Sequence, residues 1–121
     1  MSVESYKDLI VWQKSVELVT AVYDLTDRFP RSEMYGLVSQ MRRAAVSIPS
    51  NVAEGRRRSS RKDFRNFLLN AFGSGAELET QVEIAIRLGF GKNSDYSRVD
   101  GLLDEVMRML NKMVSNLQAT S

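Results

Sequence analysis

The sequence predicts an all-α protein, an antiparallel up-down-up-down four-helix bundle. Apolar residues recur at spacings of three and four along four separate stretches, as expected for helices that each bury one face. No stretch alternates polar and apolar residues as a strand would, and only two prolines and seven glycines interrupt the 121 residues. Short connections between the stretches favour antiparallel neighbours in one domain spanning residues 1–121.

The first helix is expected over about residues 7–28, because the residue before Pro30 is pushed out of the helical region. The stripe predicted to face the core consists of Leu9, Trp12, Val16, Val19 and Tyr23. Apolar residues outside the predicted stripes are interpreted as a self-association surface, the alternative being scattered exposure on a monomer. They are Ile10, Val11, Leu18, Met34, Val38 and Phe72.

The second helix is expected over about residues 33–56, with Ser32 as its N-cap. Its predicted core stripe is Leu37, Met41, Ala44, Ile48 and Val52. Pro49 lies inside this helix and frees the carbonyl of Ala45, so a kink is expected there.

The third helix is expected over about residues 60–88, capped by Ser59 or Ser60, with a stripe from Phe64 to Ala85. Gly73 and Gly75 each cost about 1 kcal/mol relative to alanine inside a helix, which predicts a close approach by another backbone. The expected partner is the small-residue face of the second helix, Ala44, Ala45 and Ser47.

The fourth helix is expected over about residues 95–117, with Ser94 or Asp95 as its cap. Its predicted stripe is Val99, Leu102 or Leu103, Val106, Leu110, Met113 and Leu117.

Composition excludes several classes of protein. The 43% apolar and 26% charged residues are typical of a folded soluble domain. The absence of cysteine and histidine excludes disulfides, zinc and copper sites and the Ser-His-Asp triad, so no catalytic residue, cofactor or metal is expected. No apolar run could cross a membrane and no signal peptide is visible, which predicts a cytoplasmic location.

Positive charge is concentrated in the middle of the chain. Residues 42–65 contain eight bases and two acids, whereas the rest contains nine bases and thirteen acids. The densest cluster is Arg56, Arg57, Arg58, Arg61, Lys62 and Arg65. Arginine forks match phosphate oxygens, so these residues are candidates for binding a nucleic-acid backbone. No aromatic residue lies between Arg56 and Lys62, so base stacking is not indicated; the alternative is a solvated loop or one that pairs with acids of a neighbouring subunit.

Two further polar groups are considered. Arg42, Arg43, Ser47, Asn51 and Glu54 are interpreted as a structural polar network, with a ligand or nucleic-acid pocket as the alternative. One cluster of carboxylates is a candidate magnesium site and consists of Glu77, Glu79 and Glu83. The alternative is an ion pair between Glu83 and Arg87, one helical turn apart, and this pair is expected.

Several motifs carry a family resemblance. They are Leu9-Ile10-Val11-Trp12-Gln13-Lys14, Phe29-Pro30, Tyr35-Gly36-Leu37, the run from Arg42 to Gly55 (RRAAVSIPSNVAEG), Phe67-Leu68, Gly73-Ser74 and Glu77-Leu78-Glu79-Thr80. Over about residues 6–115 the chain resembles the four-helix-bundle proteins encoded by intervening sequences of bacterial 23S ribosomal RNA genes. Phe72 and Gly75 depart from that family's pattern.

The resemblance implies a homopentamer and kinship with the accessory variability protein of diversity-generating retroelements, whose partners are nucleic acid and a reverse transcriptase. The expected function is therefore a non-enzymatic, oligomeric accessory protein that binds RNA or DNA backbone through the basic cluster. The alternative is a protein-interaction or scaffold module of the same bundle family without a nucleic-acid role.

Overall fold

Four long helices make up nearly all of the protein. The structure, a computed structural model, describes residues 5–119, with side chains described up to residue 117. The helices are α1 (Ile10–Thr26), α2 (Leu37–Arg56), α3 (Arg61–Leu88) and α4 (Asn93–Ala119). Short 3-10 helices, η1 (Tyr6–Asp8) and η2 (Arg31–Glu33), precede α1 and α2. No strand occurs within residues 5–119.

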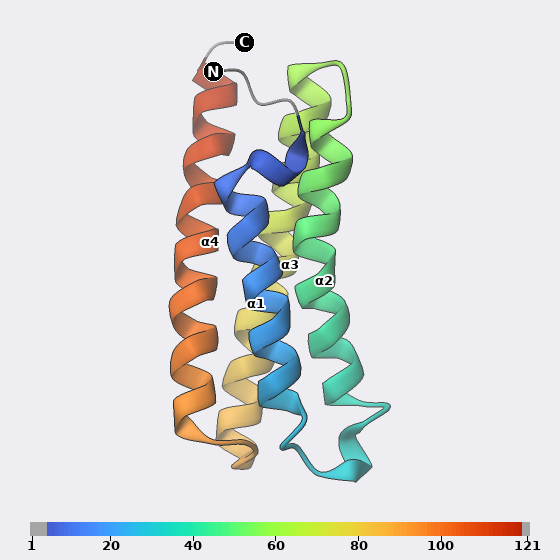
Figure 1. The fold of residues 1–121 in the computed structure, drawn as a ribbon, viewed down its shortest axis with the longest axis vertical. Coiled ribbons are helices and arrows are strands. Elements are labelled where there is room, and N and C mark those ends of the chain that lie inside the picture. The colour runs from blue at the N-terminus through green and yellow to red at the C-terminus, as the bar shows by residue number, and fades with distance from the viewer. Residues whose placement is uncertain (1–4, 120–121) are drawn as a thin grey trace.

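The helices run alternately down and up along one long axis (Figure 1). Helix α1 packs against α2 and α4, and α3 packs against the same two helices. The α2–α3 connection lies at the end that also carries η1 and the end of α4, and the other two connections lie at the opposite end (Figure 1). The predicted up-down-up-down bundle is thus confirmed.

Helix α1 buries a different face from the one the sequence predicts. Its core face is Val11, Ser15, Leu18, Ala21, Val22, Leu25 and Thr26. Tyr23 of the predicted stripe is 40% exposed. The prediction is wrong because this helix is apolar on more than one side, so that spacing alone does not select the core face. Leu9, Trp12 and Val19 of the predicted stripe pack against the core but are only partly buried. Ser15 donates to the carbonyl of Trp12 at 2.9 Å and Thr26 to that of Val22 at 2.8 Å, so both are buried without losing hydrogen bonds.

The predicted stripes of the other three helices largely match the structure. Helix α2 buries Met41, Ala44, Ile48 and Val52, and α3 buries Leu68, Ala71, Gly75, Leu78, Val82 and Ala85. Helix α4 buries Val99, Leu103, Val106 and Leu110, but Val114 lies in the core where Met113 was expected. Helix α2 continues through Pro49 to Arg56.

Helix ends differ from the predicted ones by a few residues. Ser32 does not cap α2, because it lies in η2 and the helix begins after Gly36, where a Glu33 carboxylate accepts from the Leu37 amide. Ser60 caps α3 as predicted, accepting from the Asp63 amide at 3.0 Å. Helix α4 begins at Asn93, before both predicted caps.

Two glycines, Gly55 and Gly75, allow close packing between helices. The sequence predicts a close approach at Gly75 but not at Gly55. A Cβ on Gly75 would collide with the Met107 side chain of α4, so Gly75 accommodates a side chain of α4 and not the backbone of α2. Gly73 is exposed with nothing within 4 Å of a built Cβ. The close α2–α3 approach is at Gly55, where a Cβ would lie 2.6 Å from Cβ of Phe67.

Tyr96 secures the end of the bundle that carries the α3–α4 connection. Its hydroxyl donates to the Phe90 carbonyl at 2.6 Å. Burial, with a smaller contribution from the charge of Asp100, raises the pKa of Tyr96 from 10.0 to about 12. The folded protein therefore keeps this proton where the unfolded chain loses it.

We expect the free energy of unfolding to fall as the pH rises from about 10 to about 12, because the unfolded chain ionises first. Urea melts across this range, compared with those of Tyr96→Phe, measure the effect. The variant should lose less stability over the same interval; equal losses in the two proteins would contradict this assignment.

Candidate nucleic-acid interface

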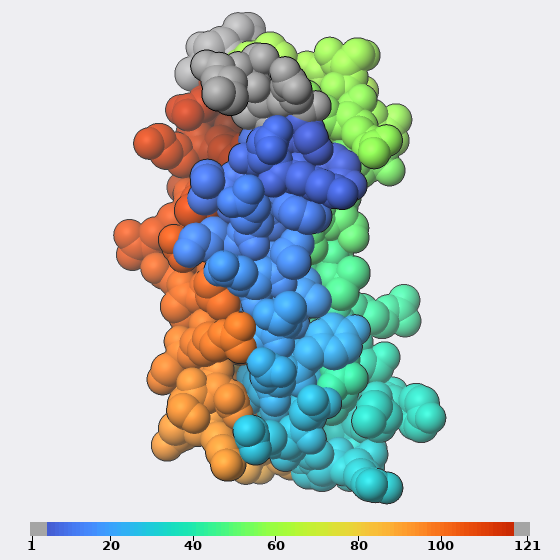
Figure 2. Space-filling model, viewed as in Figure 1, coloured from blue at the N-terminus to red at the C-terminus, as the bar shows by residue number. Residues whose placement is uncertain are grey.

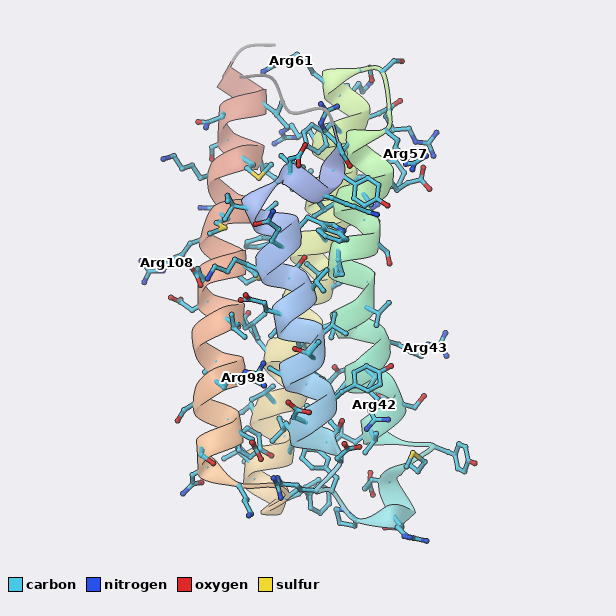
Figure 3. The ribbon with its side chains drawn as sticks, in the orientation of Figure 1. Arg42, Arg43, Arg57, Arg61, Arg98 and Arg108 are labelled. Atoms are coloured by element: carbon cyan, nitrogen blue, oxygen red, sulfur yellow. The ribbon has the colours of Figure 1, made fainter. Side chains whose placement is uncertain are left out.

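Six cations gather at the end of the bundle that carries the α2–α3 connection. This surface, here called the basic end, consists of Arg56, Arg57, Arg58, Arg61, Lys62 and Arg65. Arg57 and Arg61 project from this end of the molecule (Figure 3). Arg57, Arg58, Arg61 and Lys62 are exposed, whereas Arg56 and Arg65 are half-buried. All six belong to the end of α2, the connection that follows it and the first turns of α3.

Two of these arginines lie over aromatic rings. Cζ of Arg57 is 5.4 Å from the centre of the Tyr6 ring, and Cζ of Arg58 is 5.0 Å from that of Phe67. Such contacts stabilise a cation and limit the orientations of its guanidinium plane. The sequence run contains no aromatic residue, but η1 and α3 supply one each. The sequence offered no signal for Tyr6, which is about fifty positions from its arginine.

Two acidic residues, Glu54 and Asp63, lie in or beside this stretch of the sequence. Glu54 pairs with Arg58 at 3.3 Å, one helical turn away, and both side chains are about half exposed. Asp63 lies in the first turn of α3, where its negative charge stabilises the partial positive charge of the helix N-terminus. Arg65 donates from Nε to the carbonyl of Val114 at 3.3 Å, which ties the basic end to α4.

The five residues predicted as one polar network fall into separate contacts. Arg42 turns to α1: it donates to Thr26 and Asp27, each at 2.9 Å, and lies 4.3 Å from the centre of the Tyr23 ring. Glu54 pairs only locally, with Arg58. Arg42 therefore anchors α2 to the end of α1, a role that periodicity alone did not indicate.

The rest of the proposed network joins α2 to α3. The hydroxyls of Ser47 and Ser74 lie 2.8 Å apart. The Asn51 amide donates to both the carbonyl and the hydroxyl of Ser47, at 2.8 and 3.0 Å. The Asn51 side chain, close to Pro49, thus donates to the Ser47 carbonyl and not to the Ala45 carbonyl, which the proline leaves without its helical donor. Arg43 points away from the bundle, and no contact with another described residue holds its guanidinium (Figure 3).

An apolar groove lies beside Arg43, between α2 and the α1–α2 connection. It has a volume of about 590 Å³ and is lined mainly by Tyr23, Met34, Tyr35, Val38, Arg43 and Val46. Tyr35 is 96% exposed. Figure 2 shows this connection projecting from the lower edge of the molecule. A projecting tyrosine beside an apolar groove is typical of a contact surface.

The predicted self-association residues fall into three groups by burial. Val11, Leu18 and Val38 belong to the core of the single bundle, so they do not support association. Phe72 is half-buried and packs against that core. Ile10 and Met34 are exposed, at 57% and 46%. Of the predicted set, the exposed Met34 and the buried Val38 line the groove.

The carboxylates of α3 lie close to other charged groups of the bundle. Glu83 pairs with Arg87 at 3.0 Å, as predicted. Burial and the charge of Glu83 raise the pKa of Asp100. Within residues 5–119, no group of three or more aspartates or glutamates is arranged to hold a metal ion.

None of the described helices is long and apolar enough to span a membrane.

The fold and its surfaces define an all-α, antiparallel four-helix-bundle protein with one basic end. The sequence matches the 23S rRNA-intervening sequence protein family over residues 7–112, and the chain belongs to this family. A crystal structure of a protein of unknown function from the S23 ribosomal protein family of Bacteroides thetaiotaomicron is similar, with a TM-score of 0.79 and 24% sequence identity. The similarity covers 88% of this chain and 96% of that one. A comparison with curated protein sequences finds no match.

Proposed function

We propose that this protein is a non-enzymatic, cytoplasmic, oligomeric accessory protein that binds RNA or DNA backbone through its basic end. The proposal is supported by the position of six cations at the end of α2, in the α2–α3 connection and in the first turns of α3, with Asp63 as the one acid between them and Glu54 just before them. Several arginines on one surface bind adjacent phosphates and release counterions, a mechanism that needs no sequence-specific contact.

The aromatic contacts of Arg57 and Arg58 support this proposal. An arginine held over a ring loses fewer conformations on binding than one that is free in solvent. A guanidinium has five N–H donors, so Arg58 keeps donors for phosphate oxygens beside its pair with Glu54 at 3.3 Å. A direct titration with nucleic acid, designed in the Discussion, tests the proposal.

Oligomer formation is proposed through the groove at Tyr35, with a second copy of this chain as its occupant. The groove combines exposed apolar side chains with the unengaged cation of Arg43. The outer surface of α3 offers a matching combination, with Glu79 beside the exposed Ile84 in a second shallow groove. Two different surfaces that fit each other make a head-to-tail contact, which generates a ring when the rotation closes. A homopentamer is the ring implied by the family resemblance.

We expect light scattering at micromolar concentration to give several times the 13.7 kDa mass of one chain, and five times for a pentamer. Replacing Met34 and Tyr35 together by serine should lower this mass, because it removes the most exposed apolar contacts of the groove. Leu88→Ser, which changes an exposed apolar residue outside both grooves, is the control. A monomeric wild-type protein would contradict the oligomer.

A protein-interaction or scaffold module is the second candidate function. The Tyr35 groove favours it, since the groove would also accept an apolar segment of another protein, including a reverse transcriptase. Salt separates the two functions. Phosphate binding by several cations weakens steeply as salt rises, whereas an apolar protein contact does not.

A further inference from the structure

The N-terminal turn places an aromatic ring at the basic end. Ser5 caps η1 by accepting from the Lys7 amide at 3.1 Å, and Gln13 of α1 donates to the Lys7 carbonyl at 2.9 Å. The Tyr6 and Trp12 rings meet edge to face, with their centres 5.4 Å apart. These contacts fix the position of Tyr6 beside Arg57.

An open pocket lies where this turn meets the end of α2. It has a volume of about 320 Å³ and is lined by Ser5, Tyr6, Arg56 and Arg57. The lining residues carry one aromatic ring, two guanidinium groups and the hydroxyls of Ser5 and Tyr6. This size is near the lower end of the roughly 300–1,000 Å³ typical of small-ligand pockets.

We propose that this pocket receives an unpaired base, so that the basic end binds single-stranded nucleic acid in preference to duplex. An unpaired base stacks on aromatic rings and on arginine planes, while neighbouring arginines bind its phosphates. In a duplex each base is already stacked and paired, and it reaches such a ring only by flipping out. This inference rests on the proposed function and names the substrate class of that surface.

The test compares a labelled single strand of about 20 nucleotides with a duplex of the same length, as RNA and as DNA, by fluorescence anisotropy. The wild-type protein should bind the single strand about tenfold more tightly at equal salt. Tyr6→Leu should weaken single-strand binding by about tenfold, the effect of losing one stacked base, and leave duplex binding within about twofold. Tyr6→Phe retains the ring and should behave as wild type.

Two further readings accompany this titration. Trp12 is the only tryptophan and contacts Tyr6, so its fluorescence should change when the single strand binds and not when the duplex binds. Thermal melts of both Tyr6 variants establish that each remains folded.

Each other outcome overturns the inference in a recognisable way. Equal affinity for both probes, unchanged in Tyr6→Leu, would remove the single-strand preference and leave backbone binding intact. Equal losses for both probes in Tyr6→Leu would assign Tyr6 a purely structural role. Absence of binding to any probe at low salt would overturn the proposed function as well.

Discussion

Replacing two glycines of the bundle by alanine should change stability in opposite directions. Gly55→Ala should lower the free energy of unfolding by about 1–3 kcal/mol, because its Cβ would lie 2.6 Å from Cβ of Phe67. Neither atom is the movable end of a side chain, so α2 and α3 must separate. Gly73→Ala should raise the free energy of unfolding by about 0.5–1 kcal/mol. This helical glycine is exposed, and nothing lies within 4 Å of the position that the added Cβ would take.

Urea denaturation followed by circular dichroism measures both changes, and each variant serves as the control for the other. The substitution is chemically the same in both, so a difference in sign isolates the interhelical contact. If Gly55→Ala were as stable as the wild type, the close approach of α2 to α3 would be contradicted. A similar stabilisation in both variants would show that helix propensity alone governs these positions.

Replacing Arg56, Arg57 and Arg58 by serine should weaken binding to RNA or DNA by at least about tenfold at low salt. Three lost cations should also flatten the dependence of log affinity on log salt, by about one unit for each phosphate contact removed. Helix content should remain unchanged, because these residues lie at the end of α2 and in the connection that follows it. Anisotropy titrations at several salt concentrations measure both effects.

The matched control removes the same net charge from the opposite end of the bundle. Arg31, Arg87 and Lys92 lie in η2, in the last turn of α3 and in the α3–α4 connection, and all three are exposed. Replacing them by serine should reduce binding far less than replacing the three arginines of the basic end. Equal losses in the two triple variants would mean that total charge, not the basic end, governs binding.

The fold was largely predictable because helical periodicity is a local property of the sequence. Each of the four helices has a run of apolar residues that repeats every three or four positions, and short connections leave few possible arrangements. The face of α1 was predicted wrongly for a local reason as well. Ser15 and Thr26 satisfy their hydroxyls within the helix, so polarity did not exclude them from the core.

The candidate site was predictable only in part. The cations of the basic end are adjacent in sequence, so their clustering follows from the chain itself. Tyr6 reaches Arg57 through the folding of η1 onto the bundle, and no pattern in the sequence links the two. Likewise Arg42 was assigned to a network along its own helix, whereas its partners Thr26 and Asp27 belong to the end of α1.

The most direct test of the central claim is an anisotropy titration of the wild-type protein with labelled single- and double-stranded RNA and DNA, from about 50 to about 300 mM salt. If the basic end binds nucleic-acid phosphates, the affinity is measurable at low salt, and log affinity falls steeply and linearly with log salt. Absence of binding to every probe at about 50 mM salt, or an affinity independent of salt, would contradict the claim.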